Sequence, residues 1–199
     1  KHLLRENSQV LGMIGAGTQG RFHTGVIKHI CPSIREVMAF DINPEQLNQF
    51  QSHIQDTYGL TVKFAQDPEM VFRESDIVVT ATTADRPQVK RDWLKEGGLY
   101  IGLESFRYWG EEALLSVDKL VTDDSNQAQA FLMNSRHIQK FPRLYGELSE
   151  IVTGNKPGRE AQDEKVLCIF IGMAIVDLVL GNLVYHLALE RGIGTRLPL

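Results

Sequence analysis

Cysteine and tryptophan are scarce in this chain, because its 199 residues contain only two of each. Cys31 and Cys168 stand among apolar residues, where a free thiol behaves as a small hydrophobe, and two cysteines cannot form a disulfide framework. This scarcity predicts a reducing, cytoplasmic setting. An excess of basic residues is also missing, since the net charge is −4 and both signs are interspersed, so we expect no nucleic-acid partner.

Uninterrupted hydrophobic segments are lacking as well. Residues 1–7 contain no apolar region of the signal-peptide kind and no initiator Met, and we expect the sequence to belong to a longer protein. One long apolar run, Val166 to Leu189, contains Asp177 near its middle, and a central Asp costs roughly 2.5–3.5 kcal/mol on membrane-insertion scales. We therefore expect no membrane partner and predict a helix over this run, buried or at a subunit interface.

From Val10 onward, short β-branched runs alternate with helical stretches. This alternation is typical of an α/β fold in which helices connect the strands of a parallel sheet. Asn43-Pro44, Asp67-Pro68 and Asp124-Ser125 are typical helix starts. The predicted strands are Val10–Ile14, Glu36–Phe40, Thr61–Ala65, Ile77–Thr80, Leu99–Leu103 and Lys119–Thr122. Six such strands predict a doubly wound, mostly parallel sheet, whose carboxyl edge binds ligands.

The composition changes after about Tyr145. A turn-rich break at residues 153–158 is followed by the apolar run, which ends at glycines near residues 192–194. A helix that is apolar on nearly all sides packs against another surface. We expect residues 1–145 to form the sheet domain, and residues 146–199 to form a C-terminal helical segment that docks on another domain or subunit.

The first strand runs into Gly15-Ala16-Gly17-Thr18-Gln19-Gly20, a Gly-x-Gly-x-x-Gly sequence that opens a helix. In this motif the first glycine allows a tight turn, the second lets the backbone approach a pyrophosphate, and the third permits close helix packing. Free N–H groups at the helix start attract phosphate. The motif alone is weak evidence, and its context therefore matters.

That context is Asp41, which ends the second strand twenty-one residues after Gly20. A carboxylate there can accept hydrogen bonds from both adenosine ribose hydroxyls and repels a 2′-phosphate, so NAD is favoured over NADP. The other interpretation is a glycine turn that only caps a strand, with Asp41 in a loop. On the first interpretation, residues 1–145 are an NAD-binding Rossmann domain.

Two further segments end strands at the same edge. Thr80, Ala81, Thr82 and Thr83 combine small side chains with hydroxyls and are expected to line the nicotinamide side, although an ordinary strand exit could look the same. Glu104 follows the fifth strand, where it can act as a general base or bind a substrate amine, or be a solvated loop carboxylate. His23 and His29 are six residues apart, which is not metal-ligand spacing, and no metal is expected.

With these features in place, the chain resembles the ornithine cyclodeaminase/μ-crystallin family over nearly its whole length. The resemblance is most specific in the tail. The matching segments are Leu11–Gln19, Asp76–Thr83, Gly146–Leu148, Gly154–Arg159, Asp163-Glu164, Gly172–Asp177 and Glu190–Gly194.

The resemblance implies a homodimer of two-domain subunits, in which the Rossmann domain is inserted into a substrate and dimerisation domain. It implies that the basic residues that grip a substrate carboxylate lie upstream of this sequence, so that the chain alone binds cofactor and catalyses poorly. It also implies oxidation of an amino acid at Cα by NAD⁺ or reduction of the corresponding imine. The members' activities include ornithine cyclodeaminase, alanine dehydrogenase, ketimine reductase and amino-acid-condensing dehydrogenase.

One departure affects the activity that is expected. Ornithine-cyclising members have Asp followed by Pro-Gly-Lys after the fifth strand, whereas this chain reads Leu103-Glu104-Ser105-Phe106-Arg107. Ornithine cyclodeaminase activity is therefore not the favoured one. The leading hypothesis is an NAD-dependent oxidoreductase or deaminating lyase for a small amino acid or imine, with Glu104 as the catalytic carboxylate. The rival is a non-catalytic binding protein that keeps the dinucleotide site.

Overall fold

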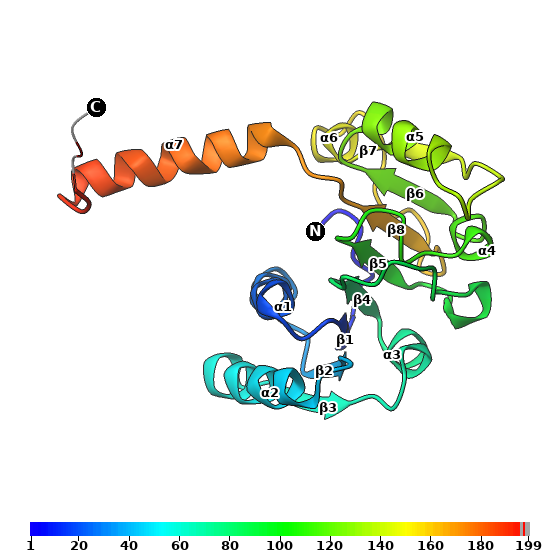
Figure 1. Cartoon of the computed structure of the whole chain (residues 1–199), viewed down its shortest axis with the longest axis horizontal. Coiled ribbons are helices and arrows are strands. Elements are labelled where there is room, and N and C mark those ends of the chain that lie inside the picture. The colour runs from blue at the N-terminus through cyan, green and yellow to red at the C-terminus, as the bar shows by residue number, and fades with distance from the viewer. Residues whose placement is uncertain (196, 198–199) are drawn as a thin grey trace.

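The structure is a computed structural model that describes residues 1–195 and 197. In these residues, eight parallel strands form one sheet (Figure 1). Their order across the sheet is β3-β2-β1-β4-β5-β8-β6-β7. The strands are β1 Val10–Ile14, β2 Glu36–Phe40, β3 Thr61–Phe64, β4 Ile77–Thr80, β5 Leu99–Gly102, β6 Lys119–Thr122, β7 Leu144–Glu147 and β8 Val166–Ile169. The helices are α1 Thr18–Ile30, α2 Pro44–Tyr58, α3 Pro68–Glu74, the 3-10 turn η1 Arg91–Trp93, α4 Glu111–Leu114, α5 Ser125–Met133, α6 Leu148–Val152 and α7 Ala174–Glu190. The predicted doubly wound α/β class is confirmed.

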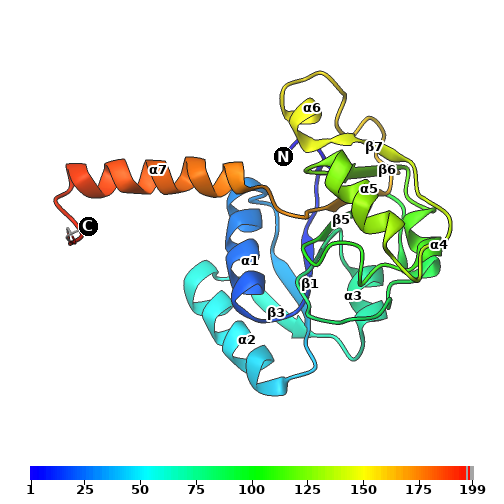
Figure 2. The same ribbon diagram turned by 45° about the horizontal axis from the view of Figure 1, so that its top comes forward.

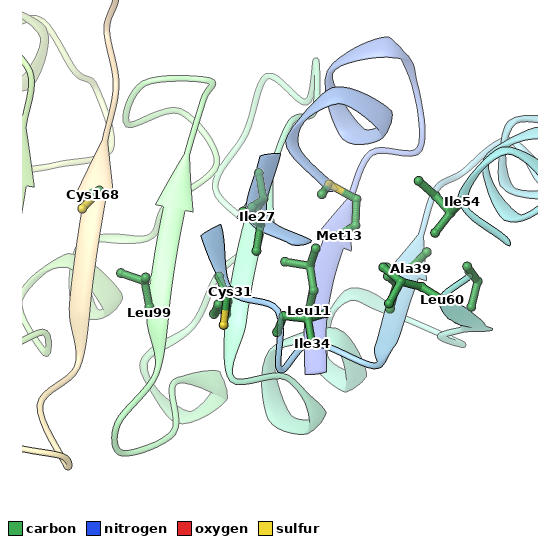
Figure 3. Packing of buried hydrophobic residues seen from close by; sticks show 14 of the residues in the cluster. Leu11, Met13, Ile27, Cys31, Ile34, Ala39, Ile54, Leu60, Leu99 and Cys168 are labelled. Carbon is green, nitrogen blue, oxygen red and sulfur yellow. The ribbon is translucent and has the colours of Figure 1, made fainter. Parts of the chain in front are cut away.

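The sheet is covered on both faces, which is why its central strands are nearly continuous apolar runs. Successive side chains of a strand point to opposite faces. On one face, Leu11 and Met13 of β1 pack with Ile27 of α1 and Ile54 of α2 (Figure 3). The opposite face carries a second apolar cluster, which includes buried side chains of α3, α4 and α5.

The helix starts follow the predicted capping residues. The side chains of Asn43, Asp67 and Asp124 accept backbone N–H groups in the first turns of α2, α3 and α5, respectively. Pro44 and Pro68 stand at the first helical positions, where a missing N–H does no harm.

The C-terminal third differs from the prediction. The helix expected from Val166 begins only at Ala174, because Val166–Ile169 forms β8 between β5 and β6. All four residues of β8 are buried, and a short, wholly apolar run fits a central strand and a buried helix equally well. The edge strand β7 was not predicted either. The sheet therefore continues past the boundary that we expected at Tyr145.

Helix α7 projects away from the sheet and its covering helices (Figures 1 and 2). None of the side chains in Ala174–Glu190 is buried by the described chain, although most of them are apolar. Across the described residues, no helix combines the length and apolarity that a bilayer crossing demands.

The strand order places a topological switch point beside β1. The chain passes from β1 to β2 and β3 on one side, and then returns to β4 on the other side of β1. At such a switch point the loops after the two neighbouring strands diverge, and ligands bind outside their carboxyl ends. The loops after β1 and β4 hold the glycine motif and the threonine-rich segment.

Candidate dinucleotide site

The glycine loop between β1 and α1 has the close packing that its sequence predicts. Gly15 has a φ of +95°, a region that residues with a Cβ rarely adopt. A Cβ on Gly15 would overlap the carbonyl oxygen of Ala81, and a Cβ on Gly20 would overlap the carbonyl oxygen of Gly15. These two glycines are therefore required for the loop to pass close to the end of β4 and for α1 to start close to the loop.

Gly17 differs from these two glycines, since no described heavy atom lies within 4 Å of a Cβ built on it. It is the N-cap of α1 and, unlike Asn43 or Asp67, offers no side-chain hydrogen bond to the helix start. The first turn of Thr18–Ile30 also carries no acidic residue. The space beside Gly17, at the positive dipole end of α1, is thus open, which fits a pyrophosphate.

Asp41, directly after β2, lies next to this loop. Its Oδ2 accepts a hydrogen bond from the backbone N–H of Ala16 at 2.8 Å, and its Oδ1 accepts one from Asn43 at 2.9 Å. The side chain is half-buried, so each oxygen keeps acceptor capacity beyond these bonds. A carboxylate held beside the glycine loop in this way fits an adenosine ribose.

Of the residues at the end of β4 and just after it, some lie at the open edge of the sheet and one lies in the core. Ala81 and Thr82 are half-buried and Thr83 is exposed, which places these three residues at the edge. Thr80 is fully buried, and its hydroxyl donates to Glu104 Oε1 at 2.7 Å. Because Thr80 shares its face with the buried Val78 of β4, its side chain points into the second cluster and does not line the edge.

Glu104 also differs from the expectation that it faces the nicotinamide. The residue is 5% exposed, and its Oε1 accepts from both Thr80 and Trp109 Nε1, the latter at 3.2 Å. Its Oε2 is buried without a hydrogen-bond partner among the described residues. Burial raises the pKa of the Glu104 carboxyl to about 7. The carboxyl group therefore lies beneath the carboxyl edge, inside the second cluster.

The local backbone explains this inward position. Gly102 leaves room for the indole, because a Cβ there would lie 2.9 Å from Trp109 Nε1. Ser105 has a φ of +61°, which turns the chain sharply after Glu104. Positive φ is uncommon for a residue other than glycine. The loop after β5 thus folds Trp109 back over the end of its own strand.

Asp123, at the end of β6, was not singled out from the sequence. Its carboxylate accepts hydrogen bonds from the backbone N–H groups of Ile171 and Gly172, in the link between β8 and α7. It borders a pocket of about 510 Å³ whose lining also includes Leu148, Phe170, Met173 and Asp177. The available signal was a carboxylate directly after a predicted strand, the same signal that identified Asp41.

His23 lies on α1, one turn after the helix start. The Nδ1 atom of His23 is 2.9 Å from the backbone oxygen of Gln19, within its own helix. Among the described residues, no group of three or more His, Cys, Asp and Glu side chains is placed to hold a metal ion.

The fold and the glycine loop together define a Rossmann-type dinucleotide-binding structure. The chain belongs to the ornithine cyclodeaminase/mu-crystallin family, whose sequence profile matches residues 1–192. It is 30% identical over 205 residues to an alanine dehydrogenase of Archaeoglobus fulgidus, covering 99% of this chain and 62% of the relative. It is 29% identical over 211 residues to a Δ(1)-pyrroline-2-carboxylate reductase of Bacillus cereus, covering 99% of this chain and 63% of the relative. This chain therefore spans less than two thirds of the length of these relatives.

Solved structures agree with these sequence matches. The Δ(1)-pyrroline-2-carboxylate reductase of Thermococcus litoralis, in complex with NADH and L-proline, superposes with a TM-score of 0.89 at 30% identity. That match covers 98% of this chain and 63% of the reductase. An archaeal alanine dehydrogenase dimer with bound NAD gives a TM-score of 0.83 at 29% identity, over 99% of this chain and 62% of that one.

Proposed function

We propose that this chain is the NAD-binding part of an oxidoreductase that acts at Cα of a small amino acid or of the corresponding imine. The observation that carries the proposal is the open space at Gly17, where α1 starts without a side-chain cap and the Asp41 carboxylate is hydrogen-bonded to the neighbouring Ala16. The named activities of the relatives, an alanine dehydrogenase and pyrroline-2-carboxylate reductases, support this substrate class.

Within this proposal, the glycine loop and the first turn of α1 bind the pyrophosphate, and Asp41 binds the adenosine ribose. Residues Ala81 to Thr83 line the nicotinamide side. When bound, NAD⁺ accepts a hydride from Cα of an amino acid, or NADH donates one to an imine carbon. The protein holds the dinucleotide at the switch point beside β1, so that its nicotinamide end lies along the carboxyl edge.

We further propose that the apolar surface of α7 packs against a substrate-binding and dimerisation domain outside these 199 residues. Helix α7 has seventeen residues, most of them apolar, and none of their side chains is buried. Such a helix is not stable on its own in water, which supports the proposed contact. On this basis the complete protein is a homodimer, and the chain alone binds the cofactor but gives little turnover. The buried free thiols of Cys31 and Cys168 suit a reducing compartment such as the cytoplasm.

The function is tested on the complete protein with a panel of small amino acids and NAD⁺. NADH formation is followed by nicotinamide absorbance, ammonia release is measured in parallel, and NADH consumption is followed with cyclic imines. The ammonia assay is needed because a cyclodeaminase regenerates its cofactor. We expect turnover of at least one substrate. Binding of NADH without NADH formation, NADH consumption or ammonia release would instead support the non-catalytic binding protein.

The quaternary proposal has its own measurement. Sedimentation of the complete protein at micromolar concentration should give a dimer. A monomer at that concentration would contradict the proposed role of α7.

A further inference from the structure

The buried carboxyl of Glu104 lies in the core next to the proposed cofactor site. Its Oε1 already accepts from two donors, Thr80 and Trp109, and its Oε2 is buried. With 5% of the residue exposed, neither oxygen is presented to a ligand at the open edge. Direct contact with a substrate is therefore not the role that this geometry supports.

A continuous set of contacts connects Glu104 to the glycine loop. The Thr80 hydroxyl donates to Glu104, and the Thr80 carbonyl accepts from the backbone N–H of Leu103 at 3.0 Å, which ties the ends of β4 and β5 together. The next residue, Ala81, donates its N–H to the carbonyl of Ile14 at 2.8 Å. The Ala81 carbonyl then lies directly against Gly15, where it leaves no room for a Cβ.

From these contacts, and on the basis of the proposed function, we infer that Glu104 is a positioning residue for the dinucleotide site. Through Thr80 it fixes the end of β4 against the glycine loop, and it does not itself touch substrate. This role replaces the catalytic one that the sequence suggested for Glu104.

The protonation state of Glu104 then affects cofactor binding. Oε2 has no hydrogen-bond donor among the described residues, and the two donors on Oε1, Thr80 and Trp109, offset only part of the cost of burying the negative charge of the ionised form. The pKa of about 7 that burial produces places this ionisation in the neutral range. Two charged or titratable side chains adjoin the carboxyl on its own loop. Burial and the charge of Glu104 raise the pKa of Tyr108, and Arg107 Nε donates to the backbone oxygen of Glu104, away from the carboxyl.

The test is NADH titration of the complete protein, followed by nicotinamide fluorescence at pH 6 and pH 8. If only the protonated form holds the site in its binding conformation, wild-type affinity falls up to about tenfold between these pH values, in proportion to the competent fraction. Glu104→Gln carries no titrating carboxyl and should show no such loss. The matched control, Glu112→Gln, removes an exposed carboxylate from α4 and should follow the wild type.

A second pair of variants tests the contact itself. Thr80→Val removes the buried hydroxyl while keeping the shape, and should weaken NADH binding at pH 6. Thr80→Ser keeps the hydroxyl and should bind NADH like the wild type. Thermal melting of each variant shows whether the fold is retained, and if Thr80→Val does not fold, the pH profile of Glu104→Gln decides the question.

The outcomes separate this inference from the proposed function. If the wild type binds NADH at neither pH, both are wrong. If it binds NADH but loses less than about twofold in affinity by pH 8, or if Glu104→Gln shows the same loss, the positioning role is wrong and the cofactor assignment stands. Binding by a folded Thr80→Val variant that equals the wild type would also overturn the positioning role.

Discussion

Replacing Glu104 by glutamine should remove a distinct component of the pH dependence of folding. The substitution keeps the size and shape of the side chain but takes away its ionisation. An ordinary glutamate has a pKa of 4.5, whereas burial raises the pKa of Glu104 in the folded protein to about 7. The unfolded chain therefore releases this proton at a lower pH than the folded chain does.

The sign of the effect follows from proton binding. Between pH 4.5 and about 7 the folded state holds a proton that the unfolded state has lost, so the free energy of unfolding falls as the pH rises through this window. The contribution of Glu104 is fully present below pH 4.5 and is lost once the pH exceeds about 7. Because a pKa shift of one unit corresponds to about 1.4 kcal/mol, the free energy of unfolding falls by about 3 kcal/mol across this window.

The assay is urea unfolding of the wild type and of Glu104→Gln at pH 5 and pH 8. Other groups titrate in this range, but they are common to both proteins and cancel in the difference. Glutamine introduces a buried amide at the unpartnered position, which costs about 1–3 kcal/mol at every pH. The stability difference between the proteins should therefore shift in favour of Glu104→Gln by about 2–3 kcal/mol from pH 5 to pH 8, whatever its absolute value.

A fluorescence measurement reports on the same proton. Trp93 and Trp109 are the two tryptophans of the chain, so Trp93→Phe leaves only the indole that donates to Glu104. Its emission should titrate near pH 7, and the titration should vanish when Glu104→Gln is added. A stability difference that stays constant between pH 5 and pH 8 would refute the account of Glu104 as a buried, neutral carboxyl.

Three further substitutions have defined outcomes. Asp123→Ala leaves the N–H groups of Ile171 and Gly172 without their acceptor and should lower the free energy of unfolding by about 2–3 kcal/mol, with faster amide exchange at both residues. A change below about 0.5 kcal/mol would contradict a stabilising role for these hydrogen bonds. Ser105→Gly removes the steric strain of a left-handed backbone at a residue with a Cβ, and should stabilise the protein by up to about 1 kcal/mol in urea unfolding. A clear destabilisation would show that contacts of the Ser105 side chain outweigh this strain. Asp41→Ala should weaken NADH binding about 10- to 100-fold by fluorescence titration, and unchanged affinity would remove the ribose assignment.

The predictable parts of the fold were those with strong local signals. The glycine loop, the capped starts of α2 and α3, and Asp41 at the end of β2 all combine a residue type with a fixed place next to an apolar run. Each of these signals has a local physical cause, such as a positive φ at Gly15 or a cap for free N–H groups. Neighbouring residues alone are enough to detect them.

The errors arose where distant parts of the chain decide the structure. Val166–Ile169 becomes a strand because β5 and β6 leave a place between them, and nothing within those four residues indicates this. Strand β7 has a glycine and only one buried residue, so its pattern is weak. For Glu104, the sequence located the residue after β5 but not the turn at Ser105, which directs the side chain into the core.

The central claim, that the glycine loop after β1 binds a dinucleotide, is tested most directly by calorimetric titration of Gly17→Ala with NADH. An added Cβ meets no described atom within 4 Å, and the φ of −75° suits alanine, so the folded protein should be as stable as the wild type. The methyl group should nevertheless occupy the place of the pyrophosphate and weaken NADH binding by at least about tenfold, a loss of about 1.4 kcal/mol or more. Gly181→Ala in α7, where a Cβ also meets open space, is the control and should bind NADH like the wild type. Equal NADH affinity in Gly17→Ala and the wild type would contradict the account.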